Sequence, residues 1–300
     1  MNPVSVRVPG STSNCGAGFD TLGMAVQLYN TVTLSPAEGR EAKPESDSDG
    51  RAAAMVAEVG REFLAVTGVE TPGFTYRIEG DVPSSRGLGS SVTVLAGVLG
   101  GLNHWAGNAL TDRDMAKVLT RIEGHPDNAT AGVWGGFCVT LCGETAAEFR
   151  ETIRIEVPAE IKFVVVSPDL EISTKSSRGV LPASISHVDA TRSINSAAFI
   201  SAAMAKGDFS KLQGAVSDFM HEPYRLPGIP GGAEAIAAGI QAGGFTGWLS
   251  GSGSSVLCVA EGANATNVEA AMRAAFAAEG SASSGQILSA DNNGMRIVSD

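Results

Sequence analysis

The stretch that most constrains the fold is GDVPSSRGLGSSVTVLAG, in the first third of the chain. It joins an alternating segment at 74–80, which predicts a strand, to residues 90–105, whose apolar positions have helical spacing. Gly87 and Gly89 leave the turn free of side chains, and Ser90 falls at the start of the helix. The first amides of a helix lack partners and lie at the positive end of its dipole. The turn is therefore either an anion site or a plain serine cap.

Composition limits what kind of anion could bind there. The net charge of −11 argues against broad electrostatic binding to nucleic acid or to an anionic membrane. The GxxxxGK[ST] phosphate loop is absent, and so is a convincing GxGxxG dinucleotide motif after a strand. An anionic ligand must therefore be held locally, by backbone amides.

The length of 300 residues predicts two domains in close contact, and a charged stretch places their boundary near residue 155, giving 1–155 and 156–300. In the first part we expect strands at 3–9, 26–35, 74–80 and 137–142, helices at 52–66, 90–105 and 110–124, and loops at 10–23, 36–50 and 125–136. In the second we expect strands at 161–168, 247–250, 256–261 and 294–299, and helices at 189–205, 208–221, 232–243 and 266–279. Helices mixed with an antiparallel sheet predict an α+β fold.

Neither the start of the chain nor its cysteines indicate an extracytoplasmic protein. The start, MNPVSVRVPG, lacks the pattern of a signal peptide, and no apolar run is long enough to cross a bilayer, so we expect a cytoplasmic protein. Cys15, Cys138, Cys142 and Cys258 lack metal-site spacing and predict buried thiols, although the role of Cys15, inside a glycine-rich turn, stays open.

Three glycine-rich stretches together resemble the GHMP kinases. PSSRGLGSSV is similar to the phosphate loop of that family, PGSTSNCGAGFDTLG to its first motif and LSGSGSSVLCV to its C-terminal motif, in the family's order and over essentially the whole chain. The resemblance implies that ATP is bound by Pro83, Ser84, Ser85, Arg86, Gly87, Leu88, Gly89, Ser90, Ser91, Val92 and Thr93, with Val92 in place of the usual Ala. It also implies an N-terminal domain like ribosomal S5 domain 2, a ferredoxin-like C-terminal domain, an active site between them and a homodimer.

Within the family, the first motif is most similar to that of the homoserine kinases. By that resemblance Asn14 and Asp20 bind the substrate, and Asp20 supplies the carboxylate that its ammonium group needs. Read alone, Asp20 could equally cap a turn. The stretch RIEGHPDNATAGVWGGF implies that Glu123 and Ser91 hold Mg²⁺ and that Asn128 orients the substrate hydroxyl. Asp127 is the candidate if a general base exists; read alone, HPDN is a good turn.

Two arginines complete the expected substrate site. Arg178, in ISTKSSRGVLP, and Arg225, in HEPYRLPGIPG, lie in contexts similar to those of homoserine kinases, which implies that they bind the substrate carboxylate. A single arginine is more often a solvated surface residue. His104, His187 and His221 show no ligand spacing and receive no role.

The expected activity is ATP-dependent phosphorylation of the L-homoserine side-chain hydroxyl in threonine biosynthesis, with Asn128 and Asp20 in the catalytic site. One alternative is another GHMP kinase, acting on mevalonate or a sugar-like alcohol; Asn128, where those kinases place a carboxylate, argues against it. The other is a non-catalytic nucleotide-binding protein on the same fold, which would not need both Ser91 and Glu123.

Overall fold

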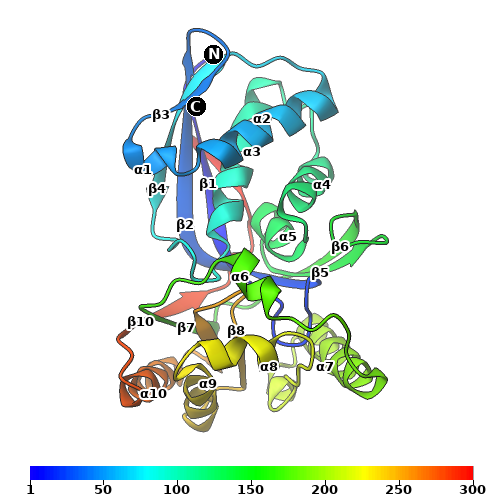
Figure 1. Cartoon of the computed structure of the whole chain (residues 1–300), viewed down its shortest axis with the longest axis vertical. Coiled ribbons are helices and arrows are strands. Elements are labelled where there is room, and N and C mark those ends of the chain that lie inside the picture. Colours follow the sequence, from blue (N-terminus) through cyan, green and yellow to red (C-terminus); the bar gives the residue numbers. More distant parts are fainter. Residues whose placement is uncertain (300) are drawn as a thin grey trace.

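A seven-stranded sheet forms the upper half of the molecule (Figure 1). The structure, a computed structural model, describes residues 1–299. The central strands run in the order β11-β1-β2-β4-β3, while β5 pairs with β2 and β6 with β5. Their bounds are β1 (Val4–Ser13), β2 (Leu22–Ala37), β3 (Ala42–Pro44), β4 (Gly73–Gly80), β5 (Phe137–Cys142), β6 (Phe149–Ile155) and β11 (Arg296–Ser299). The last strand thus returns to the sheet that the first strand begins.

Four helices cover one face of this sheet (Figure 1): α2 (Ala53–Thr67), α3 (Ser90–Trp105), α4 (Asp112–Glu123) and α5 (Asp127–Trp134). Helix α3 is buried along most of its length. Its glycines allow it to lie close to the sheet, because a Cβ at Gly97 would lie 2.4 Å from Val32 and one at Gly101 would lie 2.5 Å from Leu34. The close packing of α3 on the sheet places the N-terminus of this helix at the lower end of the sheet.

The second sheet has the order β10-β7-β9-β8, and all its pairs are antiparallel. Its strands are β7 (Ile161–Pro168), β8 (Thr246–Leu249), β9 (Val256–Glu261) and β10 (Ser283–Ser289). One face packs on α9 (Gly232–Gln241) and α10 (Ala265–Ala278). The other face joins α7 (His187–Lys206) and the lower ends of β2 and β5 in one apolar cluster, which includes Met24, Phe137, Phe163 and Met204. The predicted α+β fold is confirmed; the domain boundary near residue 155 stays a prediction.

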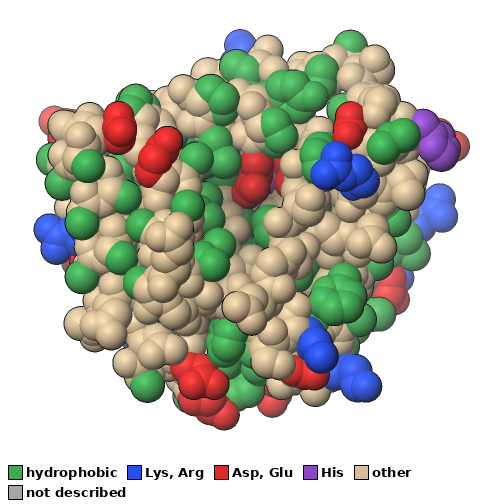
Figure 2. Space-filling view, turned by 90° about the horizontal axis from the view of Figure 1, so that it is seen from below, with side chains coloured by type: hydrophobic (Ala, Val, Ile, Leu, Met, Phe, Trp, Pro, Cys, Tyr) green, Lys and Arg blue, Asp and Glu red, His purple; other side chains and the backbone are tan. Residues whose placement is uncertain are grey.

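Short elements complete the fold. They are α1 (Asp47–Gly50), α6 (Thr174–Gly179), α8 (Glu222–Arg225) and 3-10 turns at Phe209–Leu212 and Leu226–Gly228. Among the described residues, no helix has the length and apolar character needed to cross a bilayer. On the face seen in Figure 2, acidic and basic side chains are scattered among each other, with no continuous basic patch.

Several local predictions were wrong. The expected helix at 208–221 is a 3-10 turn followed by irregular chain, because Gly214 adopts φ +68° and Asp218 accepts the amides of His221 and Glu222, which starts α8 instead. The expected loop at 36–50 contains β3 and α1, the latter capped by Ser46. The expected loop at 125–136 contains α5, whose burial against β1 and β2 outweighs its weak helix formers.

Two strands were not predicted, and one cysteine differs from expectation. Strand β6 lies inside the charged stretch that suggested a boundary, and β10 is an edge strand with mostly polar side chains, all of them at least partly exposed. Neither has the apolar alternation on which strand prediction depends. Cys15, Cys138 and Cys258 are buried free thiols as predicted, whereas Cys142, at the end of β5, is only partly buried.

Candidate active site

The predicted phosphate loop ends at the N-terminus of α3. Gly89 is the cap residue and adopts φ +70°, and no side-chain hydrogen bond caps the helix within the described residues. A glycine is needed there, since a Cβ would lie 2.3 Å from the hydroxyl oxygen of Ser11. The first amides of α3 therefore have no side-chain cap among the described residues. This arrangement favours an anion site over a serine cap.

The two other glycine motifs pack directly on this loop. The hydroxyl of Ser250, in the turn between β8 and β9, donates to the carbonyl of Gly87 at 2.7 Å. Ser255 N–H donates to the carbonyl of Arg86 at 3.2 Å, and Ser11 N–H to that of Leu88 at 3.1 Å. Segments from the start, the middle and the end of the sequence thus enclose one pocket.

Not all predicted loop residues face this pocket. Those that line it are Pro83, Ser85, Gly87, Leu88, Gly89, Ser90 and Ser91. Val92 is buried in the core, and Thr93 accepts a hydrogen bond from Asn30. Arg86 forms ion pairs with Asp169 and Glu171 on the outside of the loop. Ser84 lies in the loop but not in the pocket lining.

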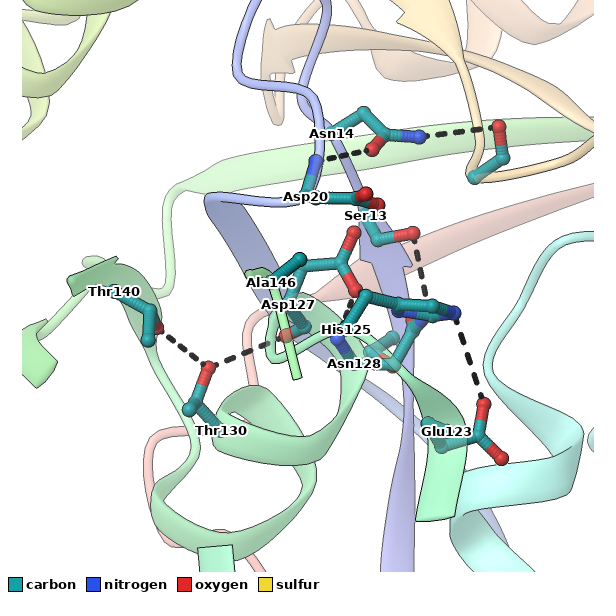
Figure 3. Close-up of polar contacts among 12 residues, drawn as sticks. Ser13, Asn14, Asp20, Glu123, His125, Asp127, Asn128, Thr130, Thr140 and Ala146 are labelled. Carbon is teal, nitrogen blue, oxygen red and sulfur yellow. Dashed lines mark hydrogen bonds and ion pairs between the residues drawn. The ribbon is translucent and has the colours of Figure 1, made fainter. Parts of the chain in front are cut away.

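Ser91 and Glu123 meet at the edge of the pocket. The Ser91 hydroxyl donates to Glu123 Oε1 at 2.5 Å, and Glu123 Oε2 lies 3.9 Å from His125 Nε2 (Figure 3). Glu123 is the last residue of α4, and Ser91 lies in the first turn of α3. A hydroxyl and a carboxylate are hard oxygen donors of the kind that Mg²⁺ takes from proteins, so this pair fits that ion.

His125 and Asp127 form a buried pair beside Glu123 (Figure 3). His125 Nδ1 lies 2.6 Å from Asp127 Oδ1, which also accepts the amide of Asn128. Burial opposes a charge on His125, but Asp127 outweighs it and raises the pKa of His125 to about 9. Although burial acts in the opposite direction, His125 lowers the pKa of Asp127. The Asp127 carboxylate is therefore ionised but a weak proton acceptor.

Asn128 is held in one orientation next to the phosphate loop. Its Oδ1 accepts from the Ser11 hydroxyl at 2.8 Å, and its Nδ2 donates to Ser13 Oγ at 3.1 Å. A Cβ at Gly89 would lie 3.2 Å from Asn128 Oδ1. The side chain thus lies where the loop comes nearest to the first motif.

Asp20 and Arg178 form an ion pair in the lining of the pocket. The Arg178 guanidinium donates to both carboxylate oxygens of Asp20, at 3.1 and 2.7 Å. Asp20 adopts φ +53°, and its amide donates to Asn14 Oδ1 at 3.1 Å (Figure 3). Asn14 Nδ2 donates to the carbonyl of Gly251, so the first motif is tied to the third. Burial opposes the charge on Arg178, yet its bonds to Asp20 raise the pKa of Arg178.

Arg225 approaches the same pocket from α8. Its guanidinium carbon lies 5.2 Å from the centre of the Phe19 ring, and that of Arg178 lies 5.3 Å from it. Arg225 Nη1 donates to the carbonyl of Gly251 at 3.1 Å, and Nε donates to that of Ser177 at 3.2 Å. Burial and the charge of Arg178 lower the pKa of Arg225 to about 10, which leaves it charged at neutral pH. Neither arginine is the solvated surface residue that each could have been.

Some pocket residues were missed in the sequence. The lining also includes Ser13, His125, Ile172, Ser173, Thr174 and Ser252. Ser13 and Ser252 belong to the first and third motifs, and Thr174 lies four residues before Arg178. Each of them could therefore have been found from its position in or near a recognised motif. His125 was interpreted as a turn residue, and His221, buried behind Phe19, received no role.

Two family descriptions match the chain: "GHMP kinases N terminal domain" matches residues 51–136 and "GHMP kinases C terminal" matches residues 200–278. A homoserine kinase of Moorella thermoacetica is 35% identical over 299 residues, covering 98% of this chain and 99% of that protein. A homoserine kinase of Corynebacterium kroppenstedtii is 36% identical over 264 residues, covering 85% of this chain and 84% of that protein.

Solved structures agree on the fold. A crystal structure of homoserine kinase from Cytophaga hutchinsonii superposes with a TM-score of 0.89 at 24% identity, covering 99% of this chain and 98% of that one. Galactokinase of Lactococcus lactis, complexed with galactose, gives 0.71 at 12% identity, covering 98% and 95%. The predicted two-domain GHMP kinase fold is therefore confirmed. With a curated relative 35% identical over nearly its full length, the chain belongs to the homoserine kinase family of GHMP kinases.

Proposed function

We propose that this protein transfers the γ-phosphoryl group of ATP to the side-chain hydroxyl of L-homoserine, giving O-phospho-L-homoserine for threonine biosynthesis. The observation that carries the proposal is that Asp20, Arg178 and Arg225 line the same pocket as the phosphate loop. An acidic group opposite two basic groups complements an amino-acid zwitterion. The relatives named homoserine kinase support the same substrate.

In this proposal the substrate binds by replacing the ion pair between Asp20 and Arg178 with two ion pairs of its own. The ammonium group of the substrate would pair with the Asp20 carboxylate, whose backbone amide is held by Asn14. The substrate carboxylate would pair with Arg178 and Arg225. Because the ammonium and carboxylate groups of the substrate are then both fixed, the orientation of its side-chain hydroxyl is restricted. Fixing the geometry in this way is a large part of what phosphoryl transfer requires.

ATP would bind with its phosphates at the amides of residues 87–91, where the positive end of α3 favours negative charge. The pair Ser91 and Glu123 would hold Mg²⁺, which when bound neutralises charge on the phosphates. Ser84, Arg86, Val92 and Thr93 would contribute by keeping the loop in shape, since their side chains point away from the pocket or into the core.

The hydroxyl would be oriented by Asn128, whose amide cannot take up a proton at neutral pH. Asp127 is the nearby carboxylate, but its lowered pKa makes it a weak base. We therefore propose direct transfer, in which the substrate hydroxyl oxygen bonds to the γ-phosphorus while the bond from that phosphorus to the β,γ-bridging oxygen breaks and ADP leaves. The hydroxyl proton passes to an oxygen of the transferred phosphoryl group. Positioning and charge stabilisation would then supply the catalysis.

Two other functions fit the same fold less well. A mevalonate- or sugar-type kinase shares the fold, but its substrate carries no ammonium group that could replace Arg178 as the partner of Asp20. A non-catalytic nucleotide binder would have no use for the Ser91 and Glu123 pair. A homodimer and a cytoplasmic location stay predictions.

An assay of ADP release over L-homoserine, L-threonine, mevalonate and galactose tests the proposal. We expect turnover with L-homoserine and at most weak turnover with L-threonine, whose hydroxyl lies on a branched carbon. Turnover with mevalonate or galactose in preference to L-homoserine would overturn the substrate assignment. ATP binding without turnover of any of the four would favour the non-catalytic alternative.

A further inference from the structure

His221 connects the first motif to an arginine of the pocket, although nothing in the sequence gave it a role. The side chain is fully buried, and its ring stacks on Phe19 with centroids 5.4 Å apart. Its Nε2 lies 2.7 Å from the carbonyl oxygen of Gly16, and its Nδ1 lies 3.4 Å from Arg225 Nη1. It is not part of the pocket lining, so it lies behind the residues that would touch a substrate.

These two contacts fix the form of the imidazole. The Gly16 carbonyl can only accept, so Nε2 carries the hydrogen; Arg225 can only donate, so Nδ1 offers its lone pair. The ring is therefore neutral. Burial agrees with this, because it lowers the pKa of His221 despite the opposing charge of Asp218.

The contacts of Arg225 leave one of its nitrogens free. Nε donates to the Ser177 carbonyl, and Nη1 is shared between the Gly251 carbonyl and His221 Nδ1. Among residues 1–299, Nη2 has no hydrogen-bond partner, while the side chain lines the pocket. The guanidinium is thus held on one side and presents its other side to a ligand.

We propose that His221 is a positioning residue, which fixes the orientation of Arg225 and through it the carboxylate of the amino-acid substrate. This inference rests on the proposed function, since it takes Arg225 as part of the carboxylate site. His221 also ties that arginine to the loop carrying Asp20, so the two ends of the substrate site keep a constant separation.

The backbone around His221 is fixed by other groups, so its side chain can be changed separately from the fold. Asp218 Oδ2 accepts the amides of His221 and Glu222, at 2.8 and 2.7 Å. Glu222 Oε1 accepts the amide of Leu249 at 2.7 Å, which joins α8 to β8. A substitution of His221 therefore leaves α8 anchored at its start and against the second sheet.

Two substitutions separate the two contacts of the ring. In His221→Gln the amide group reaches the place of Nε2 and can still donate to Gly16, but the acceptor for Arg225 is lost. In His221→Asn the amide oxygen lies near the place of Nδ1 and can accept from Arg225, while the bond to Gly16 is lost. The exposed His187, at the start of α7, provides the control His187→Gln.

Steady-state kinetics with each substrate varied provide the measurement. For His221→Gln we expect the KM for L-homoserine to rise about ten-fold, with the KM for ATP within two-fold of the unchanged protein. His221→Asn should raise the KM for L-homoserine less, and His187→Gln should change neither constant. An equal rise in both KM values, or a fall in kcat alone, would overturn the proposal.

A double-mutant cycle with Arg225→Gln separates this inference from the proposed function. If His221 acts through Arg225, adding His221→Gln to Arg225→Gln should raise the KM for L-homoserine less than two-fold further. Full additivity overturns the inference but leaves the proposed function intact. If Arg225→Gln itself leaves the KM for L-homoserine unchanged, the carboxylate site is wrong, and the inference falls with it. Should His221→Gln fail to fold, the same cycle with His221→Ala, which also removes the acceptor for Arg225, decides.

Discussion

Arg178 and Asp20 are 158 residues apart in the sequence, yet the guanidinium of one bonds both carboxylate oxygens of the other across the pocket. Arg178 thus already pairs with a carboxylate, the group at one end of a zwitterion. Asp20 already pairs with a cation, the charge at the other end. A substrate with both charges can replace both partners at once, whereas a neutral alcohol can replace neither. In the proposed function the pair would select amino acids, because separating the two charges without compensation is unfavourable.

The first prediction concerns Arg178. In Arg178→Gln we expect the KM for L-homoserine to rise about 100-fold, from the loss of a two-point bond to a carboxylate, and the KM for ATP to change little. Steady-state kinetics with each substrate varied measure this. The control is Arg40→Gln, which removes an exposed arginine paired with Glu70. Unaltered L-homoserine kinetics in Arg178→Gln would contradict the assignment.

The second prediction concerns Glu123. Glu123→Gln keeps the acceptor for the Ser91 hydroxyl but removes the charge, so we expect kcat to fall by about 10²–10³ and the Mg²⁺ concentration for half-maximal rate to rise. Rates over a series of Mg²⁺ concentrations measure both. Glu62→Gln, at a surface carboxylate paired with Arg121, is the control. A Glu123→Gln protein with normal rate and Mg²⁺ dependence would remove Glu123 from the metal site.

The third prediction concerns pH. Asp127 raises the pKa of His125 from an ordinary 6.5 to about 9, so between these values the folded state binds more protons than the unfolded chain. The contribution to stability is complete below pH 6.5 and is lost as the pH rises through 9; it amounts to about 3 kcal/mol. Urea unfolding at pH 6.5, 8 and 9.5 should show this fall, and His125→Gln should reduce it.

Glu222 adds a second pH dependence of the free energy of unfolding, and the experiment must separate it from that of His125. Burial raises the pKa of Glu222 to about 8 from 4.5, so its contribution also falls with rising pH, but between 4.5 and 8. Glu222→Gln should therefore flatten the curve at lower pH and leave the fall between 8 and 9.5. If His125→Gln retained the whole fall between 8 and 9.5, the assignment to His125 would be wrong.

The fourth prediction compares two glycines with nearly the same backbone. Gly87 and Gly107 adopt φ +73° and +71°, so alanine costs each about 1 kcal/mol of backbone strain. At Gly107 a Cβ meets nothing within 4 Å, but at Gly87 it would lie 2.0 Å from the Ser250 carbonyl oxygen. We expect Gly87→Ala to lose about 2 kcal/mol more than Gly107→Ala in urea unfolding and to raise the KM for ATP. Equal losses would mean that the third motif does not pack tightly on the loop.

Much of the pocket could be predicted because its glycines are required by local geometry. Gly87, Gly89 and Gly251 all need positive φ, and Gly87 and Gly89 have no room for a Cβ, so the motifs that contain them keep a recognisable spacing. Asp20 and Arg225 were found only because each lies next to such a motif or in a context that resembles the family. Most of the residues that line the pocket thus lie in or near a recognisable sequence motif.

The rest depended on contacts between distant segments. The pairing of Asp20 with Arg178 and the bond of His221 to Gly16 join residues from opposite halves of the chain, which periodicity cannot reveal. Helix α5 was taken for a loop because its sequence is rich in weak helix formers, and only its burial stabilises it. The region 208–221 has helical spacing, but Gly214 and the capping by Asp218 interrupt it.

The return of β11 to the first sheet has a practical consequence for handling the protein. Ser299 pairs with Ser5, so both ends of the described chain lie at the same end of β1, while Ser13 at its other end lines the pocket. Ten residues of strand separate the two ends by ~30 Å. A fusion partner or a surface tether joined at either terminus would therefore leave the pocket facing away from the attachment, open to small molecules from solution.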